Sequence, residues 1–253
     1  EATRRFIVSA GGNIRPIANN VLTISPTIYW QRNWDHYQWK RGMTGAAKGE
    51  NYHRTDVFGG TINPVVNWLL GKTALGADLR KEVIYSTAYG ETLPADQWKN
   101  IHGSDRQYER RGERTNTSLF LEHNVVLEHF TLSAGLLANH NTWLSGGLRF
   151  YPGIDISWRP NAQWKVYASW NKALRLPTYT DLYISNRAQV GDMNLNPERV
   201  NTYKVGARYR TTAFETQLNA FYSNGRDMID WVFETAASTR YHALNIGKLD
   251  NMG

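Results

Sequence analysis

The chain has 253 residues, and its 29 Lys and Arg against 22 Asp and Glu give a net charge of +7. Most basic residues recur singly, and the only tight cluster, residues 106–114, also holds Glu109 and Glu113, so this charge does not predict nucleic-acid binding. Cysteine is absent and mean hydropathy is −0.55, which excludes a disulfide framework and a chain built of membrane-spanning helices.

Apolar and polar side chains alternate with a period of two along most of the chain, which predicts strands with one apolar and one polar face. In the second predicted strand, for example, Leu22 and Ile24 oppose Thr23 and Ser25. We expect ten or eleven strands, of which the first and last have the weakest patterns. In chain order they cover residues 4–10, 21–33, 55–69, 73–86, 115–127, 130–140, 148–158, 164–172, 202–210, 214–222 and 242–249.

The predicted strand at residues 164–172 indicates the environment of the sheet, a membrane on one face and water or polar groups on the other. Trp164 and Val166 lie on its apolar face, and Lys165 and Tyr167 lie on the other face. Strands of about ten residues can cross a bilayer at a tilt, whereas soluble strands average five or six. Aromatic residues at the ends of the apolar faces are typical of girdles at two membrane interfaces. Charged residues in mid-strand suit a lumen, because a sandwich core could not bury them.

The connections between these strands alternate in length. Tight turns are predicted near residues 70–72, 128–129, 159–162 and 211–213, and longer polar segments cover residues 41–54, 87–113, 174–199 and 223–241. Short turns on one side and long loops on the other are typical of outer-membrane barrels, whose long loops lie outside the cell. The predicted fold is therefore all-β, an antiparallel transmembrane β-barrel. Because an open sheet cannot span a membrane, we expect these strands to be part of a larger barrel.

Three motifs follow one another within residues 170–209. They are Arg175-Leu176-Pro177 at a strand end, then Asp181-Leu182-Tyr183, and then the eight residues from Gly191 to Glu198, which open the next strand. Their order and spacing resemble the late barrel region of TonB-dependent receptors of the siderophore and cobalamin type. Asp192 stands where that family usually has Asn. The positions that carry the family motif are Arg175, Pro177, Asn194, Leu195, Pro197 and Glu198.

We expect these motif residues to shape the loop rather than to contact a substrate. Pro197 cannot donate a ladder hydrogen bond, so it belongs at the first residue of a strand. Glu198 beside Arg175 or Arg199 would pin the loop to the barrel rim. The motif is therefore predicted to have a mainly structural role.

The resemblance implies a 22-stranded barrel in the outer membrane of a Gram-negative bacterium, surrounded by lipid and filled by an N-terminal plug. Residues 1–253 correspond to the C-terminal part of the barrel, and no plug sequence is visible, so we expect the plug upstream. Such receptors are driven by the TonB–ExbB–ExbD energising complex acting through the plug. The implied cargo is a scarce nutrient, either an iron–siderophore complex or vitamin B12.

The long loops hold aromatic and Arg residues that suit a planar, partly anionic ligand. The candidate substrate-binding residues are Trp98, Arg106, Tyr108, Tyr179, Tyr183, Arg187 and Trp231. The polar faces of the strands would line the lumen with Lys165, Tyr167, Lys204, Arg208, Glu215 and Gln217.

Two other functions stay open on the sequence alone. One is an outer-membrane pore or adhesin barrel without a plug, and the other is a soluble β-sheet binding domain. An enzyme is not predicted, because the chain has neither a Gly-x-Ser-x-Gly elbow nor a His-Glu-x-x-His motif. For the same reason we predict no cofactor and no metal site.

Overall fold

A computed structural model of the chain describes residues 2–17, 21–144 and 147–253. Its main sheet is antiparallel, with the strand order β1-β2-β3-β4-β8-β9-β10-β11-β13-β14-β17. These strands are β1 (Ala2–Gly11), β2 (Leu22–Tyr37), β3 (Asn51–Trp68), β4 (Gly71–Ser86), β8 (Arg110–Val126), β9 (Phe130–Asn141), β10 (Arg149–Trp158), β11 (Trp164–Arg175), β13 (Glu198–Arg210), β14 (Glu215–Arg226) and β17 (Lys248–Met252).

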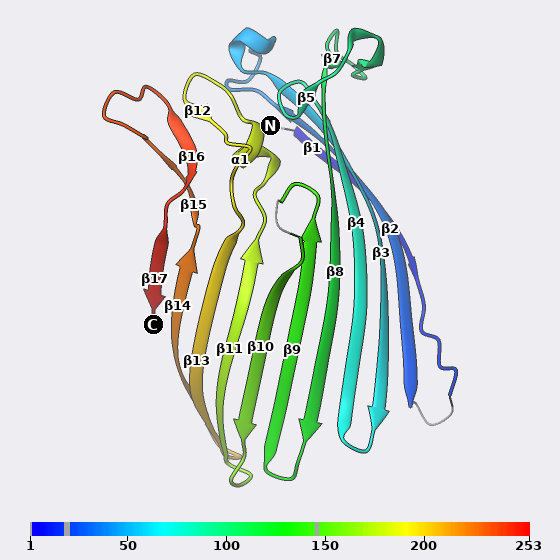
Figure 1. Cartoon of the computed structure of the whole chain (residues 1–253), viewed down its shortest axis with the longest axis vertical. Coiled ribbons are helices and arrows are strands. Elements are labelled where there is room, and N and C mark those ends of the chain that lie inside the picture. Colours follow the sequence, from blue (N-terminus) through cyan, green and yellow to red (C-terminus); the bar gives the residue numbers. More distant parts are fainter. Residues whose placement is uncertain (1, 18–20, 145–146) are drawn as a thin grey trace.

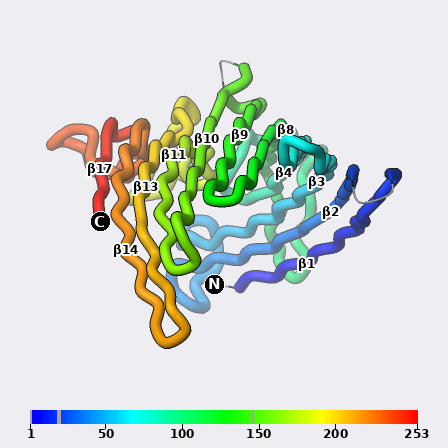
Figure 2. The backbone as a smooth tube through the Cα atoms, turned by 90° about the horizontal axis from the view of Figure 1, so that it is seen from below, coloured from blue at the N-terminus to red at the C-terminus, as the bar shows by residue number. Residues whose placement is uncertain are grey.

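The sheet forms a tall curved wall with tight turns at one end and long loops at the other (Figure 1). Seen along the strands, the wall bends around an interior without closing into a ring (Figure 2). Within the described residues, β1 and β17 are the two edge strands of the sheet and do not pair with each other. The predicted fold class is confirmed, as an antiparallel sheet that forms part of a barrel.

Short elements cover the loop end. They are η2 (Ala46–Lys48), β5 (Glu91–Thr92), η3 (Ala95–Gln97), β6 (Lys99–Asn100), β7 (Gln107–Tyr108), α1 (Tyr179–Tyr183), β12 (Gln189–Val190), β15 (Ile229–Val232) and β16 (Tyr241–Asn245). Among the residues that the structure describes, no helix is long and apolar enough to cross a membrane.

The predicted strands between residues 4 and 222 all occur, and the predicted tight turns join them. Most strands reach further toward the loop end than predicted, so that β3 begins at Asn51 and β8 at Arg110. The last predicted strand is wrong, because residues 242–249 divide between β16 and β17. Gly247 separates the two with a φ of +81°, a conformation that favours glycine.

The two faces of the wall differ as the alternation predicts. Cross-strand neighbours share a face, and Val166, Ala168 and Val205 lie on the outer one through the pairs Val166↔Ala207 and Ala168↔Val205. Val205 is 57% exposed in the isolated chain, which is the expected state of a side chain that lipid would cover. Lys165 and Arg208 are paired on the opposite, inner face.

Three inner-face aromatic rings lie flat over a glycine on the neighbouring strand. The register pairs are Tyr29↔Gly59, Phe120↔Gly76 and Tyr167↔Gly206. A Cβ atom added to Gly59 would lie 2.1 Å from the Tyr29 ring, and one added to Gly76 would lie 1.9 Å from the Phe120 ring. Each ring therefore occupies the space that a side chain would take, which is the close approach that mid-strand glycine permits.

Candidate ligand-binding rim

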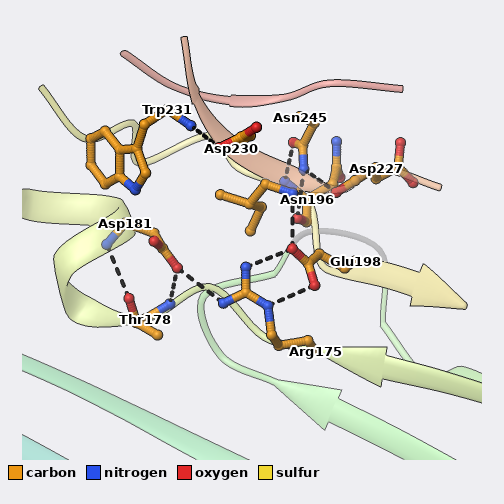
Figure 3. A network of polar contacts seen from close by, with 10 residues as sticks. Arg175, Thr178, Asp181, Asn196, Glu198, Asp227, Asp230, Trp231 and Asn245 are labelled. Atoms are coloured by element: carbon orange, nitrogen blue, oxygen red, sulfur yellow. Dashed lines mark hydrogen bonds and ion pairs between the residues drawn. The ribbon is translucent and has the colours of Figure 1, made fainter. Parts of the chain in front are cut away.

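The family motif forms a polar network at the loop end of β11 and β13 (Figure 3). Arg175 and Glu198 are directly opposite on these strands, and the guanidinium donates two hydrogen bonds of 2.6 Å to the carboxylate. A third nitrogen of Arg175 lies 3.4 Å from Asp181 Oδ2. Glu198 is buried, and this bidentate geometry satisfies both of its oxygens.

Asp181 also fixes the start of α1. The Thr178 side chain accepts a hydrogen bond from Asp181 N at 3.1 Å, and Asp181 Oδ2 accepts one from Thr178 N at 2.9 Å. This capping box satisfies two donors that the short helix would otherwise leave open. Pro177 precedes it directly, so the chain turns from β11 into α1 at a fixed angle.

The same carboxylate ties a second loop to the rim. Glu198 Oε1 accepts a hydrogen bond of 2.9 Å from Ile229 N, at the start of β15. Nearby, the amide of Asn245 accepts from Asn196 N at 2.9 Å and donates to Asn196 O and Asp227 O at 3.1 and 2.6 Å (Figure 3). Two segments that are about 50 residues apart in the chain are thereby locked together.

Under this network lies a small apolar cluster of Leu182, Leu195 and Ala243. The partly buried side chains that pack against it are Trp143, Tyr183, Ile229 and Trp231. Pro197, one residue before β13, is also fully buried. Leu195, Pro197 and Glu198 are thus buried, whereas Asn194 is exposed and hydrogen-bonds Asp192. The structural role of the motif stays a prediction.

Beside the cluster, on the inner face, Arg114 lies against two aromatic rings. Its Cζ atom is 5.1 Å from the ring centre of Trp143 and 5.1 Å from that of Tyr179. It also donates to Glu82 at 2.6 Å and to the carbonyl of Pro177 at 2.8 Å. The rings of Trp143 and Tyr183 are 5.8 Å apart. We call Arg114, Trp143, Tyr179 and Tyr183 the rim aromatic cluster.

The phenols of this cluster keep their protons at neutral pH. Burial raises the pKa of Tyr179 and that of Tyr183 above the ordinary value of tyrosine. Tyr179 Oη is buried and makes no hydrogen bond. The adjacent pocket, lined by Arg114, Trp143 and Leu195 among others, has a volume of about 60 Å³, which admits no more than a few atoms. A larger ligand would have to lie over the cluster, in the barrel interior.

The structure separates the candidate binding residues into two groups. Tyr179, Tyr183 and Trp231 come together around α1. Trp98, Arg106 and Tyr108 lie near β6 and β7. Trp98 and Arg106 donate to the carbonyls of Leu93 and Glu50, and Tyr108 is buried. Arg187 is exposed between α1 and β12.

Sequence reasoning missed Arg114 and Trp143. Arg114 belongs to the densest basic segment of the chain, and its partner Glu82 is directly opposite on β4. The alternation of apolar and polar residues along β8 predicts that Arg114 lies on the polar face. The contact between Arg114 and Trp143 could not be predicted, because Trp143 lies in a loop whose path the alternation does not define.

A second arrangement missed by sequence reasoning brings a histidine to a serine. Asp35, His53 and Ser86 are in register on β2, β3 and β4, and His53 Nδ1 is 2.7 Å from Ser86 Oγ. Ser86 is fully buried, and its Oγ accepts hydrogen bonds from the backbone N–H groups of Ala88 and Tyr89. A nucleophile must reach a substrate, so this serine instead shapes the turn after β4.

An outward apolar band, an inward polar face and a loop-end network on a long-stranded antiparallel sheet together define the wall of an outer-membrane β-barrel. The family described as TonB dependent receptor-like, β-barrel, matches residues 3–253, and the chain belongs to this family. It is an outer-membrane protein of Gram-negative bacteria. A search of curated proteins found no match.

Several solved structures share the fold. The siderophore receptor PirA of Pseudomonas aeruginosa has a TM-score of 0.73 at 16% identity, covering 99% of this chain and 43% of PirA. The ferric enterobactin receptor PfeA has a TM-score of 0.74 at 15% identity, covering 99% and 40%. The FrpB iron transporter of Neisseria meningitidis has a TM-score of 0.70 at 17% identity, covering 99% and 40%. The chain thus spans about two fifths of the length of these proteins.

Proposed function

We propose that the protein binds an iron–siderophore complex at the loop end of its barrel and imports it with energy from the TonB–ExbB–ExbD complex. The observation that supports this proposal is the rim aromatic cluster, in which the rings of Trp143, Tyr179 and Tyr183 lie together at the loop end beside Arg114, itself paired with Glu82. Ferric siderophores present planar and anionic groups, which aromatic faces and guanidinium groups recognise. The names of PirA, PfeA and FrpB support iron rather than vitamin B12 as the cargo.

Exposure divides the candidate residues by role in this proposal. Tyr108 is buried and so is the Tyr179 hydroxyl, so these two residues would support the loops. Arg187 is exposed and Tyr183 is only partly buried, so these two would contact the ligand. Trp143 and Trp231 would form the apolar floor beneath it.

The proposed transport involves no covalent chemistry. The loops would capture the complex, a plug inside the barrel would move when TonB pulls, and the cargo would pass unchanged. Inner-face residues such as Lys165 and Arg208 would line the passage, and the outer face would remain in lipid. A plug-less pore or adhesin is less well supported, since the family is one of TonB-dependent receptors. A soluble domain disagrees with the exposed apolar face of the wall.

The proposal is tested by ligand binding to the natural, full-length protein in detergent. Tryptophan fluorescence would be titrated with a ferric catecholate siderophore, a ferric hydroxamate siderophore and vitamin B12. We expect saturable quenching by one ferric siderophore, and a Trp143→Phe variant should lose part of the quenching. Trp158→Phe, which changes an outward ring of β10, is the matched control and should leave the ligand-dependent change intact.

A second variant tests the charge. Arg187→Gln should weaken siderophore binding about tenfold, the loss of one charge-assisted contact. Arg159→Gln, in the tight turn after β10, removes one positive charge at the opposite end of the wall and should have no effect. Binding of vitamin B12 alone, or no saturable binding of any ferric siderophore, would overturn the proposal.

A further inference from the structure

Residues 87–90 join β4 to β5 on the inner side of the loop end, and we call them the strap. The first of them, Thr87, donates its backbone N–H to Tyr52 O at 3.0 Å. The last, Gly90, is buried and has a φ of +104°. A Cβ atom at Gly90 would lie 2.5 Å from the backbone of Arg111, so glycine allows the strap to lie this close to β8.

The strap lies against the rim aromatic cluster. Gly112 of β8 is beside both, because a Cβ atom added there would be 3.7 Å from Gly90 Cα and 3.1 Å from Tyr179 Cε1. Burial raises the pKa of Tyr183, and the charge of Glu91, the first residue after the strap, raises it further. The position of the strap therefore sets how closely the chain after β4 approaches the proposed cargo site.

A serine and a histidine hold the strap in place. Ser86 Oγ accepts hydrogen bonds from Ala88 N at 2.8 Å and from Tyr89 N at 2.7 Å, and it lies 2.7 Å from His53 Nδ1. The ring of Tyr89 stacks on the imidazole, with ring centres 4.4 Å apart. Ser86 is fully buried, so water does not replace a bond that its hydroxyl loses.

The hydrogen bonds of Ser86 fix the protonation state of His53. A hydroxyl group has one proton to donate and two lone pairs that accept. The two N–H groups of the strap occupy both lone pairs, so the hydroxyl proton points to His53 Nδ1, which must be an unprotonated acceptor. An imidazolium ring has a proton on each nitrogen. Three donors would then face two lone pairs, and one of the bonds to the strap would break.

Titratable side chains face this contact from β2 and from the strap. Asp35 of β2 is directly opposite His53, Tyr89 covers the ring, and Tyr37 of β2 acts on Tyr89. Burial lowers the pKa of His53 from 6.5 to about 4, and it outweighs Asp35, which acts in the opposite direction. His53 is the third residue of β3 and lies beyond the outward apolar side chains of that strand, which begin at Phe58.

We propose that His53 and Ser86 form a catch that holds the strap against the rim aromatic cluster at neutral pH and releases it when His53 binds a proton. Neutral His53 accepts the proton of Ser86, which leaves the oxygen free to hold Ala88 and Tyr89. Protonated His53 competes for that oxygen, and the strap loses an anchor. The catch does not depend on the cargo. Its consequence, a more open entrance over the rim aromatic cluster in acid, rests on the proposed function.

The direction of the pH dependence follows from the lowered pKa of His53. The folded value lies below the unfolded value of 6.5, so the catch contributes its full stability above pH 6.5 and loses it as the pH falls toward 4. Each unit of difference in pKa changes the equilibrium about tenfold. The opening constant of the strap should therefore rise by up to about 100-fold across this window.

The test uses the natural, full-length protein in detergent and needs no cargo. Amide hydrogen exchange of residues 87–92 would be measured from pH 7 to pH 4, with the intrinsic exchange rate at each pH divided out. Exchange at the imidazole C2 position in the same samples gives the pH at which His53 binds its proton. We expect the protection of the strap to fall about tenfold or more and to follow this titration. Protection that stays constant, or that falls outside the titration range of His53, would overturn the proposal.

Three variants separate the catch from a general effect of acid. His53→Gln keeps an oxygen that can accept the Ser86 proton but takes up no proton, so its strap should stay protected at every pH in the window. His102→Gln makes the same substitution at an exposed residue between β6 and β7 and should keep the pH dependence of the wild type.

Ser86→Ala removes the anchor itself. Its strap should exchange as fast at pH 7 as at pH 4, while protected amides in β9 show that the wall is folded. A His53→Gln strap that opens in acid as the wild-type strap does, or a Ser86→Ala strap that stays protected, would contradict the assignment.

Discussion

The membrane wall and the loop-end rim of this barrel invert the usual relation between polarity and burial. In the wall, large apolar side chains such as Leu79 and Val205 are exposed on the outer face. At the rim, many of the buried side chains are polar or charged, among them Asp181, Glu198 and Asn141. The wall depends on lipid to cover its apolar band, whereas the rim depends on paired charges and caps. The two regions should therefore respond to different substitutions.

The largest effect is expected from a charge placed on the lipid side of the wall. Val205→Arg, between the outward rings of Tyr203 and Tyr209, should lower the free energy of unfolding by about 2–4 kcal/mol. Urea unfolding in lipid vesicles measures this loss. Lys204→Arg on the inner face is the control and should change stability little. A Val205→Arg protein as stable as the control would mean that this face does not lie in hydrocarbon.

A smaller and local loss of stability is expected when the rim network is broken. Glu198→Gln removes the charge that holds Arg175 and weakens the bond to Ile229 N, and should cost about 2 kcal/mol. Arg175 is about half exposed, so solvent limits the effect. Hydrogen exchange of residues 227–245 should accelerate about tenfold or more.

The neighbouring ion pair serves as the control for the rim. Arg199 pairs with Asp227, whose side chain is more exposed than that of Glu198. Arg199→Gln should therefore cost less than about 1 kcal/mol. Equal acceleration of exchange in both variants would show that burial of Glu198 does not set the strength of the network.

Acid should open one loop while the wall stays intact. Glu50 is buried and accepts hydrogen bonds from Gly45 N at 2.6 Å and from Gln38 and Tyr52 at 3.0 Å, with His36 at 2.9 Å. Burial alone would raise the pKa of this carboxyl, but the hydrogen bonds outweigh burial and lower it to about 2. A lowered pKa stabilises the loop above the unfolded value near 4.5, and this stability is lost as the pH falls from 4.5 toward 2.

Limited proteolysis at acid pH with pepsin would follow this opening. Cleavage within residues 38–50 should increase between pH 4.5 and 2, while the strands remain protected. Glu50→Gln removes the titrating group and is cleaved in parallel at each pH, so the ratio of wild-type to variant cleavage should rise as the pH falls from 4.5 to 2. A wild-type loop with no change in cleavage over that pH window would contradict the assignment.

The smallest expected effect concerns the cap of α1. Thr178→Ala removes the side chain that accepts from Asp181 N and should cost about 1 kcal/mol. Hydrogen exchange at residues 179–183 should accelerate, with little change in the strands. Thr180→Ala, inside the same helix, has no capping role in the structure and is the control. Matching exchange rates in the two variants would show that the capping box does not stabilise the rim.

The wall could be predicted from the sequence, because alternation fixes both the strand and its face. Trp164, Val166 and Lys165 show this, since each lies on the expected side. The strand boundaries at the loop end were less predictable. Arg54 and Arg111 indicate a loop by their charge, yet they are in strands whose outward face leaves the hydrocarbon.

The rim was only partly predictable. The sequence predicted that Glu198 pairs with Arg175 or Arg199, and in the structure its partner is Arg175. The contacts of Asn245 with Asn196, and of Trp143 with Tyr179, join segments far apart in the chain, and no periodic pattern specifies such contacts. The predicted strand at residues 242–249 is divided because β16 pairs with β15 whereas β17 pairs with β14, a change of partner that the alternation does not specify.

The three rings that cover glycines determine how far side chains project from the inner face of the barrel at these positions. At Tyr29, Phe120 and Tyr167 a stiff, flat group replaces two side chains that would otherwise project from neighbouring strands. Each ring has only two side-chain torsions, so it has little freedom to swing inward. At these three places the inner face therefore carries a rigid ring instead of flexible side chains. A domain that moves inside the barrel would meet few mobile side chains there.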